Sequence, residues 1–245
     1  MARRLAAKLL ALLVAIAVAA GGPTTANAQV AVDLQLVLAV DVSGSVSDER
    51  FRLQQKGYAQ AFRSAQVLEA IRSGTSRAIA VTMTQWTGPQ QQEVVVKWTV
   101  ISDEASMVAF ADAIDRTTRQ LYGGGTSISG AIDHAMTLFS PSQISGGRRV
   151  IDVSGDGANN RGRPAAEARD AAIKAGITIN GLPILALEPN LDQYYQNNVI
   201  GGPNAFMIVA ETFEAFAEAV IKKLISEISA LPGDGTTVHI APPYP

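Results

Sequence analysis

Oxygen-bearing side chains stand at every second position directly after the apolar segment at residues 32–40. The segment "VDLQLVLAV", residues 32–40, is followed by Asp41, Ser43 and Ser45. The apolar segment predicts a buried strand, so these residues lie on the turn that leaves its carboxyl end. Alternate residues of that turn can point the same way. We therefore expect one carboxylate and two hydroxyls to share a small volume.

Two distant stretches carry the same kind of side chain. "LYGGGTSISGAI" places Thr126 after three glycines and before a helical pattern, and "VIDVSGDGANN" places Asp156 just after a strand pattern. Ligands of open parallel sheets bind at the carboxyl ends of the strands, where such loops converge. Oxygen ligands without histidine or cysteine suit Mg²⁺ or Mn²⁺. The five residues are Asp41, Ser43, Ser45, Thr126 and Asp156.

Such a ligand set leaves the cation attractive to a further anion. Two carboxylates only neutralise a divalent charge, and hydroxyls add none. Mg²⁺ is seldom enclosed entirely by protein ligands and usually keeps exchangeable positions. An open position that faces solvent could then accept a carboxylate from another molecule.

Three segments, "DVSGS", "GGTS" and "SGDG", resemble in this order the metal-ion-dependent adhesion site of von Willebrand factor type A domains. The resemblance covers about residues 33–229. It implies that the two serines and the threonine bind the metal and that the aspartates act directly or through water. These roles would fall on Ser43, Ser45, Thr126, Asp41 and Asp156. "DERFRLQQKGYAQAF" and "NNVIGGPNAF" resemble more narrowly an uncharacterised group of exported bacterial proteins with this domain, which offers no assigned partner.

Simpler interpretations exist for the same residues. Asp41, Ser43 and Ser45 could form only a polar turn before a helix. The stretch "DVSGDGANNRGR" imitates half of an EF-hand calcium loop, but Arg163 stands at its twelfth position, where that loop requires glutamate.

An enzyme is the rival class. The chain has two histidines, His134 and His239, and no G-x-S-x-G motif for a serine hydrolase. A phosphatase that uses Asp41 as nucleophile would need an aspartate two residues later, where Ser43 stands. The alternative function is a metal-assisted hydrolase, a phosphatase or esterase, that uses the same site.

The N-terminal 28 residues predict a secretory signal peptide. Arg3, Arg4 and Lys8 precede an apolar run, and Ala26-Asn27-Ala28 forms a small-x-small end. The uninterrupted apolar run, residues 9–20, is shorter than the roughly 20 residues of a bilayer span. We expect cleavage after Ala28 and a periplasmic or secreted protein without a membrane span.

The remaining 217 residues suit one α/β domain, which we place at 29–230, followed by a flexible tail at 231–245. Removal of the three basic residues changes the formal net charge from −2 to −5. Nucleic acid is not an expected partner, because no basic patch is visible. The chain contains no cysteine, so disulfides and thiolate metal sites are excluded.

Short apolar segments rich in β-branched residues predict six strands. They are residues 32–40, 77–86, 93–100, 148–154, 177–185 and 205–210. Helical patterns begin near Ser47, Ser102, Ser127, Pro164 and Thr212, the first with continuous helical spacing over 51–68. The linker "TGPQQQ" is too short for a crossover helix, so the third strand should be an antiparallel edge strand. We predict a doubly wound, Rossmann-like α/β fold with a mostly parallel six-stranded sheet and helices on both faces.

These observations predict an exported, divalent-metal-dependent binding module and not an enzyme. Its open metal position would capture a Glu or Asp side chain of an unidentified partner protein. The "TGPQQQ" hairpin should lie beside this position. Trp86, Tyr194 and Tyr195 are the expected aromatic anchors of the surrounding rim, as apolar side chains commonly are in interfaces.

Overall fold

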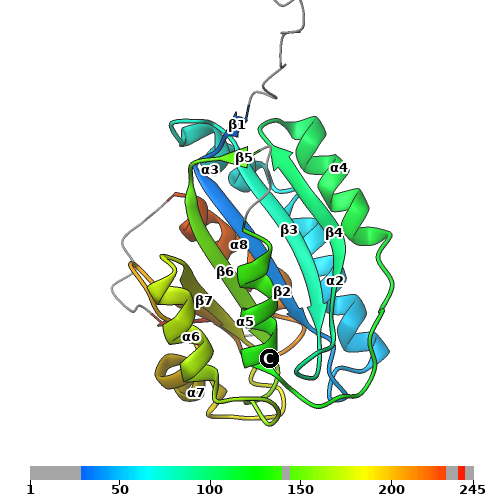
Figure 1. Cartoon of the computed structure of the whole chain (residues 1–245). Coiled ribbons are helices and arrows are strands. Elements are labelled where there is room, and N and C mark those ends of the chain that lie inside the picture. Colours follow the sequence, from blue (N-terminus) through cyan, green and yellow to red (C-terminus); the bar gives the residue numbers. More distant parts are fainter. Residues whose placement is uncertain (1–28, 140–143, 230–236, 241–245) are drawn as a thin grey trace, which may run out of the picture.

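A mostly parallel seven-stranded sheet runs through the molecule and carries helices on both faces (Figure 1). The computed structural model describes residues 29–139, 144–229 and 237–240. The strand order is β4-β3-β2-β6-β7-β8-β9. Among these strands, β4 alone runs antiparallel to its neighbour. The predicted doubly wound fold with one antiparallel edge strand is confirmed.

All six predicted strands are present, and the structure adds others. Two short strands, β1 and β5, pair in a separate two-stranded sheet. The strand bounds are β1 (Val30–Ala31), β2 (Leu34–Asp41), β3 (Ile79–Trp86), β4 (Gln92–Ile101), β5 (Ile144–Ser145), β6 (Arg148–Gly155), β7 (Thr178–Pro183), β8 (Met207–Ala210) and β9 (Thr237–Ile240).

The sequence predicted six strands and a flexible tail, but residues 237–240 of that tail form a seventh strand of the main sheet, β9. Its four residues pair in parallel with β8, from Met207 opposite Thr237 to Ala210 opposite Ile240. Only Ile240 of this strand is buried, and its sequence, Thr-Val-His-Ile, alternates polar and apolar residues over four positions only, which is a weak strand signal between glycines and prolines. The other tail residues and the predicted signal peptide, 1–28, lie outside the described residues.

Each face of the sheet has its own layer of helices. One apolar cluster joins the sheet to four helices and a second joins it to three. The first layer contains α2 (Asp48–Ala61), α3 (Ala65–Ser73), α4 (Glu104–Asp115) and α8 (Phe216–Ile228), and the second contains α5 (Ile128–Thr137), α6 (Ala165–Lys174) and α7 (Leu191–Asn198). None of these described helices is long and apolar enough to span a membrane.

The helices differ from the predicted pattern in two places. The continuous helical spacing over 51–68 is divided, because α2 ends at Ala61 and α3 begins at Ala65. The region between the predicted strands at 177–185 and 205–210, where no helical pattern was predicted, contains α7, whose Leu191 and Tyr195 are fully buried against the sheet. These residues are four positions apart, which places them on one face of a helix.

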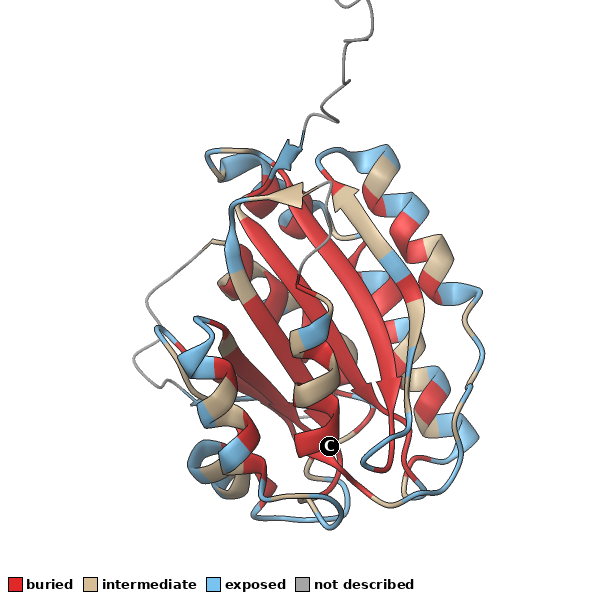
Figure 2. Ribbon diagram, in the orientation of Figure 1, coloured by how far each residue is buried: buried red, intermediate tan, exposed pale blue. Residues whose placement is uncertain are grey.

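Strand β2 lies inside the sheet between β3 and β6, and all eight of its residues are buried (Figure 2). Its apolar character on both faces follows from helices that cover both sides. Val40 lies opposite Ser154 of β6, and Asp41 lies opposite Trp86 of β3. This register brings the ends of β2 and β6 together, as the candidate site requires.

A buried group of charges joins α8 to β6. Lys223 Nζ lies 2.9 Å from Asp152 Oδ1 and 2.6 Å from Glu227 Oε1. Asn180 Nδ2 also donates to Glu227 Oε1, at 3.0 Å. All four side chains are almost completely buried. Lys223 therefore neutralises part of the charge of two carboxylates that water does not reach.

We predict that Lys223→Met lowers the free energy of unfolding by about 3–5 kcal/mol, because it leaves two buried carboxylates without their cation. Lys222→Met is the matched control, since Lys222 pairs with Glu218 at 2.7 Å but both side chains are half exposed. Its effect should stay below about 1 kcal/mol. Urea unfolding of the three proteins measures both values, and equal losses in the two variants would contradict the prediction.

Candidate metal centre

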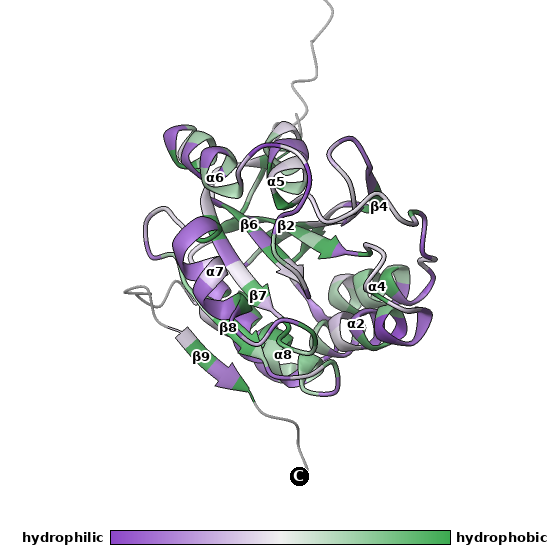
Figure 3. Ribbon diagram, turned by 90° about the horizontal axis from the view of Figure 1, so that it is seen from below, coloured by the Kyte–Doolittle hydropathy of each residue, from purple (hydrophilic) through white to green (hydrophobic). Residues whose placement is uncertain are grey.

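The structure brings all five predicted ligand residues to one end of the sheet. Asp41 ends β2, and Ser43 and Ser45 lie on the turn between β2 and α2. Asp156 directly follows β6, and Thr126 precedes Ser127, the residue that caps α5. This is the lower end of the molecule in Figure 1 and the end that faces the viewer in Figure 3. The candidate site therefore lies at the carboxyl ends of the central parallel strands.

Direct hydrogen bonds connect the five residues. Ser43 N–H donates to Asp41 Oδ1 at 2.7 Å, and the hydroxyls of Ser43 and Ser45 lie 3.2 Å apart. Ser45 Oγ donates to Asp156 Oδ1 at 2.5 Å, and Thr126 Oγ1 lies 3.4 Å from Ser43 Oγ. Two carboxylates and three hydroxyls thus form one continuous cluster of oxygen atoms.

Each carboxylate of the cluster keeps one oxygen without a hydrogen-bond partner. Asp41 Oδ2 and Asp156 Oδ2 are buried and accept no hydrogen bond. Gly155 leaves room for the first of them, since a Cβ at that position would lie 2.9 Å from Asp41 Oδ2. Buried carboxylate oxygens without partners are costly, so the arrangement favours a positive group beside them.

The pKa values of the two carboxylates also favour a positive group beside them. Burial, together with the charge of Asp156, raises the pKa of Asp41 to about 7, although the Ser43 N–H bond opposes the shift. Burial also raises the pKa of Asp156, against the Ser45 hydroxyl and the Arg50 guanidinium. A divalent cation would reverse both effects, because it favours the ionised carboxylates.

The donor chemistry fits a hard divalent cation. The described residues contain no group of three or more His, Cys, Asp or Glu side chains that could hold a metal. The candidate centre has two carboxylates, and hydroxyl oxygens supply its other donors. Asp41, Ser43, Thr126 and Asp156 are buried, whereas Ser45 is half-buried and its neighbour Gly44 is exposed. The cluster is therefore open to solvent on the side of Ser45.

Asn160 holds Thr126 in place, and the sequence analysis did not identify it. Thr126 N–H donates to Asn160 Oδ1 at 2.9 Å, and Asn160 N–H donates to the Thr126 carbonyl, also at 2.9 Å. Gly125 precedes this pair with a φ of 79°, and a Cβ there would lie 2.9 Å from Asn160 Oδ1. The sequence signal for Asn160 was the polar pair "NN" after "SGDGA". This pair does not reveal the contact with Thr126, which is 34 positions away.

Two arginines support the turn that carries the serines. Arg119 Nη2 donates to the carbonyls of Val42 and Ser43 at 2.8 and 2.9 Å. Arg50 Nη1 donates to the Ser45 carbonyl at 2.8 Å and lies 3.8 Å from Asp156 Oδ2. Their side chains fix the backbone of the turn, and Arg50 offsets part of the charge of Asp156.

The predicted aromatic rim is wrong for two of its three residues. Trp86 is fully buried, because it ends a central strand and packs beneath the helices on that face. Tyr195 is also fully buried, because α7 turns it toward the sheet. Its hydroxyl lies near Asp41, since a Cβ on Gly155 would be 3.1 Å from Tyr195 Oη and 2.9 Å from Asp41 Oδ2. Tyr194 is half-buried.

Tyr122 is the exposed aromatic residue on the segment that leads to Thr126. It is 65% exposed, and Arg119 lies 4.7 Å from its ring centre. The "TGPQQQ" hairpin lies nearby, as expected, because a Cβ on Gly88 would meet the Gly124 carbonyl at 2.8 Å. The Thr87 carbonyl accepts a hydrogen bond from Ser127 N–H at 2.8 Å. The hairpin therefore packs against residues 124–127, the segment that carries Thr126.

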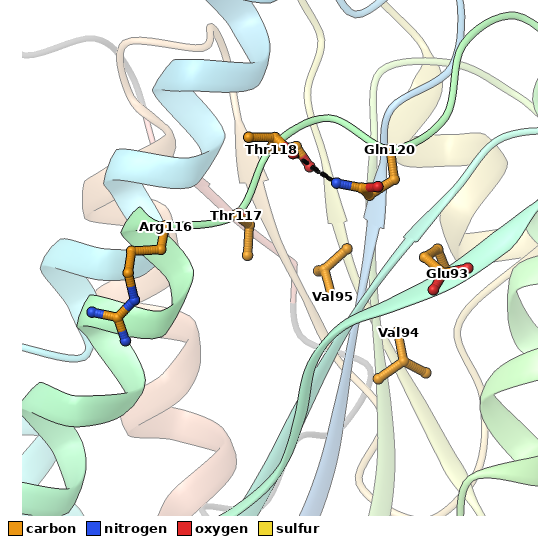
Figure 4. A pocket seen from close by; sticks show the side chains of 7 residues that line it. All are labelled: Glu93, Val94, Val95, Arg116, Thr117, Thr118 and Gln120. Carbon is orange, nitrogen blue, oxygen red and sulfur yellow. Dashed lines mark hydrogen bonds between the residues drawn. The ribbon is translucent and has the colours of Figure 1, made fainter.

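A separate hollow of about 280 Å³ lies between the start of β4 and the segment after α4 (Figure 4). Gln120 Nε2 donates to Thr118 Oγ1 across its edge at 2.6 Å. None of the five candidate ligands lines it. It is thus distinct from the metal centre.

A family model described as "Protein of unknown function (DUF1194)" matches residues 31–232. No curated protein matches the chain. Solved structures with a similar fold include a von Willebrand factor type A protein from Catenulispora acidiphila, at 17% identity and a TM-score of 0.56. The alignment covers 80% of this chain and 43% of that one.

Two further structures are described in terms of adhesion or a metal site. One is proximal thread matrix protein 1 from the mussel byssus, with a zinc-occupied metal-ion-dependent adhesion site (15% identity, TM-score 0.59, covering 82% of this chain and 49% of that one). The other is the pilus adhesin SpaC from Lactobacillus rhamnosus GG, at 14% identity and a TM-score of 0.59. This alignment covers 83% of this chain and 31% of that one. The chain spans less than half the length of each of these three proteins, and it shares the von Willebrand factor type A fold with them.

We predict that the metal-free protein loses stability as pH rises from about 4 to about 7. The folded-state pKa of Asp41, about 7, lies above its ordinary value of 3.8. Protonated Asp41 therefore contributes stability that is fully present below pH 3.8 and is lost as pH rises through about 7. At 1.36 kcal/mol per pKa unit, the loss is on the order of 4 kcal/mol.

Urea unfolding in chelator at several pH values measures this loss against Asp41→Asn, which cannot ionise at that position. Asp152, whose pKa burial also raises to about 7, is present in both proteins and cancels from the difference. The variant should lose less stability than the wild type over this range. Parallel pH profiles for the two proteins would show that Asp41 does not titrate as described.

Proposed function

The chain belongs to the family described as "Protein of unknown function (DUF1194)", and we propose that it is an exported module that binds a partner protein through a divalent cation. Asp41, Ser43, Ser45, Thr126 and Asp156 would hold Mg²⁺ or Mn²⁺. The bound cation would supply an open coordination position for a Glu or Asp side chain of the partner. Export rests on the N-terminal pattern and remains a prediction.

The observation that carries the proposal is the pair of buried carboxylate oxygens without partners. Asp41 Oδ2 and Asp156 Oδ2 belong to one hydrogen-bonded cluster of oxygen donors. A purely structural polar turn would use hydrogen-bond donors to satisfy these atoms. A hard cation satisfies both at once, and the oxygen-only donor set suits Mg²⁺ or Mn²⁺.

A protein carboxylate is the ligand that this site favours. Two carboxylates neutralise the cation and leave no excess negative charge to repel another anion. Ser45 and Gly44 leave the cluster open to solvent on one side. Tyr122, on the segment before Thr126, and Tyr194, on α7, replace Trp86 and Tyr195 as candidate aromatic anchors. An adhesin and a thread matrix protein among the similar structures support a protein partner.

The geometry gives less support to the alternative, a metal-assisted phosphatase or esterase. His134 lies on α5, two turns beyond Thr126, and His239 lies on the edge strand β9 near Glu211. Neither histidine is placed to take a proton beside the five oxygen donors. Ser43 stands where the acid of an aspartate-dependent phosphatase would be needed.

We predict that the protein binds Mg²⁺ or Mn²⁺ and that Thr126→Val weakens binding at least about tenfold, while Thr126→Ser retains it. Valine keeps the shape of threonine but removes the hydroxyl, and serine keeps the hydroxyl. Calorimetric titration of the wild type and both variants measures the affinities. The metal should also raise the thermal midpoint of the wild type, since it binds only the folded state. Equal binding by wild type and Thr126→Val would refute the site.

The second prediction concerns the partner. Immobilised wild-type protein should retain a protein from the native exported fraction in Mg²⁺ and release it in chelator. Asp41→Ala should retain none under either condition. The hydrolase alternative predicts Thr126-dependent turnover of a phosphate or acyl ester, so the same proteins are assayed with p-nitrophenyl esters. Retention that is insensitive to chelator, or Thr126-dependent turnover, would contradict the binding mechanism.

A further inference from the structure

A third carboxylate, that of Glu188, lies beside the candidate metal centre. Glu188 is on the exposed segment between β7 and α7. Its Oε2 accepts a hydrogen bond from Ala158 N–H at 3.0 Å. Ala158 is two residues beyond Asp156, so this bond ties the Glu188 carboxylate to the loop that carries the candidate ligand.

The second oxygen of Glu188 faces the space next to Thr126. A Cβ built on Gly157 would lie 3.4 Å from Glu188 Oε1 and 3.8 Å from Thr126 Oγ1. The two oxygens thus border the same small space, and Gly157 leaves it empty of side-chain atoms.

A carboxylate with two oxygens can make two kinds of contact at once. Glu188 Oε2 accepts the bond from Ala158, and rotation about the side-chain bonds would bring Oε1 closer to the oxygen cluster. Asp41 and Asp156 retain buried oxygens without partners on the inner side of that cluster. An approach of Glu188 from the solvent side would add a third carboxylate to the residues that would hold the cation.

We propose that Glu188 occupies the open coordination position in the free protein and that the partner's carboxylate displaces it. This inference rests on the proposed function, because it needs a cation held by the five residues. Glu188 is a tethered competitor with an effective concentration in the millimolar range or above. A small free carboxylate cannot displace it efficiently. A partner that also contacts the surrounding loops gains enough binding energy to do so.

The consequence is selectivity for a large ligand. With Glu188 bound, three carboxylates surround the cation, so the centre no longer attracts anions in general. A partner must offer a carboxylate together with contacts to residues such as Tyr122, which is 65% exposed. Glu188 is therefore a specificity-determining residue of the proposed site and limits binding of abundant small acids.

The test uses Mn²⁺ as the probe, because the relaxation rate of water protons reports how many exchangeable waters the bound ion holds. Glu188→Gln keeps an acceptor for Ala158 N–H but removes the charge. Glu69→Gln makes the same chemical change on α3, at the opposite end of the molecule (Figure 1). We expect Glu188→Gln to bind Mn²⁺ at least about tenfold more weakly than the wild type. Its bound ion should hold one additional exchangeable water.

Acetate supplies the second arm of the experiment. It should reduce the water relaxation of Mn²⁺-loaded Glu188→Gln at millimolar concentration and leave the wild type and Glu69→Gln unchanged. Loss of charge alone would weaken Mn²⁺ binding but would change neither the water count nor the acetate response. Equal water counts and acetate responses in all three proteins overturn the role of Glu188 and leave the metal centre intact. Failure of the wild type to bind Mn²⁺ overturns both.

Discussion

Parallel pairing between β2 and β6 is the constraint on which the rest of the candidate site depends. Val40 lies opposite Ser154, so the two strands end side by side and deliver Asp41 and Asp156 to one place. A slip of one residue would turn each side chain to the opposite face of the sheet. Burial of both strands by helices on the two faces prevents such a slip. The apolar core therefore determines the geometry of a polar centre that lies beyond its edge.

Strand β6 and the residue that follows it carry two buried acidic groups, Asp152 and Asp156, which differ in the positive charges near them. Asp152 lies with Glu227 around Lys223, which supplies an internal positive charge within 3 Å of both. Asp156 lies with Asp41, and the nearest guanidinium atom, Arg50 Nη1, is 3.8 Å from Asp156 Oδ2. Lys223 offsets part of the charge of the first pair at close range, whereas the second pair has only the longer Arg50 contact among the described residues; both pairs keep buried oxygens without hydrogen-bond partners. The weaker positive charge beside the second pair supports the view that a cation from outside the chain completes it.

Local sequence patterns predicted most of the fold and all five candidate ligands. Asp41, Thr126 and Asp156 follow strands or precede helices, and these positions are recognisable without the tertiary structure. The burial of Trp86 and Tyr195 was not predictable in this way, because it depends on which helix covers each residue. Asn160 and Glu188 were missed because their contacts join residues 34 and 30 positions apart. The four residues of β9 alternate polar and apolar side chains, but so short an alternation was not distinguishable from a tail.

The position of β9 has a consequence for how the protein behaves among other chains. An uncovered sheet edge offers backbone groups to any extended polypeptide and promotes aggregation. Residues 237–240 cover β8 and leave a four-residue strand at this border, Thr-Val-His-Ile, with three of its four side chains exposed. Proteolytic removal of these residues would leave the fold's central strands intact but uncover the backbone of Met207–Ala210. The last described strand thus keeps the backbone of β8 paired within the chain.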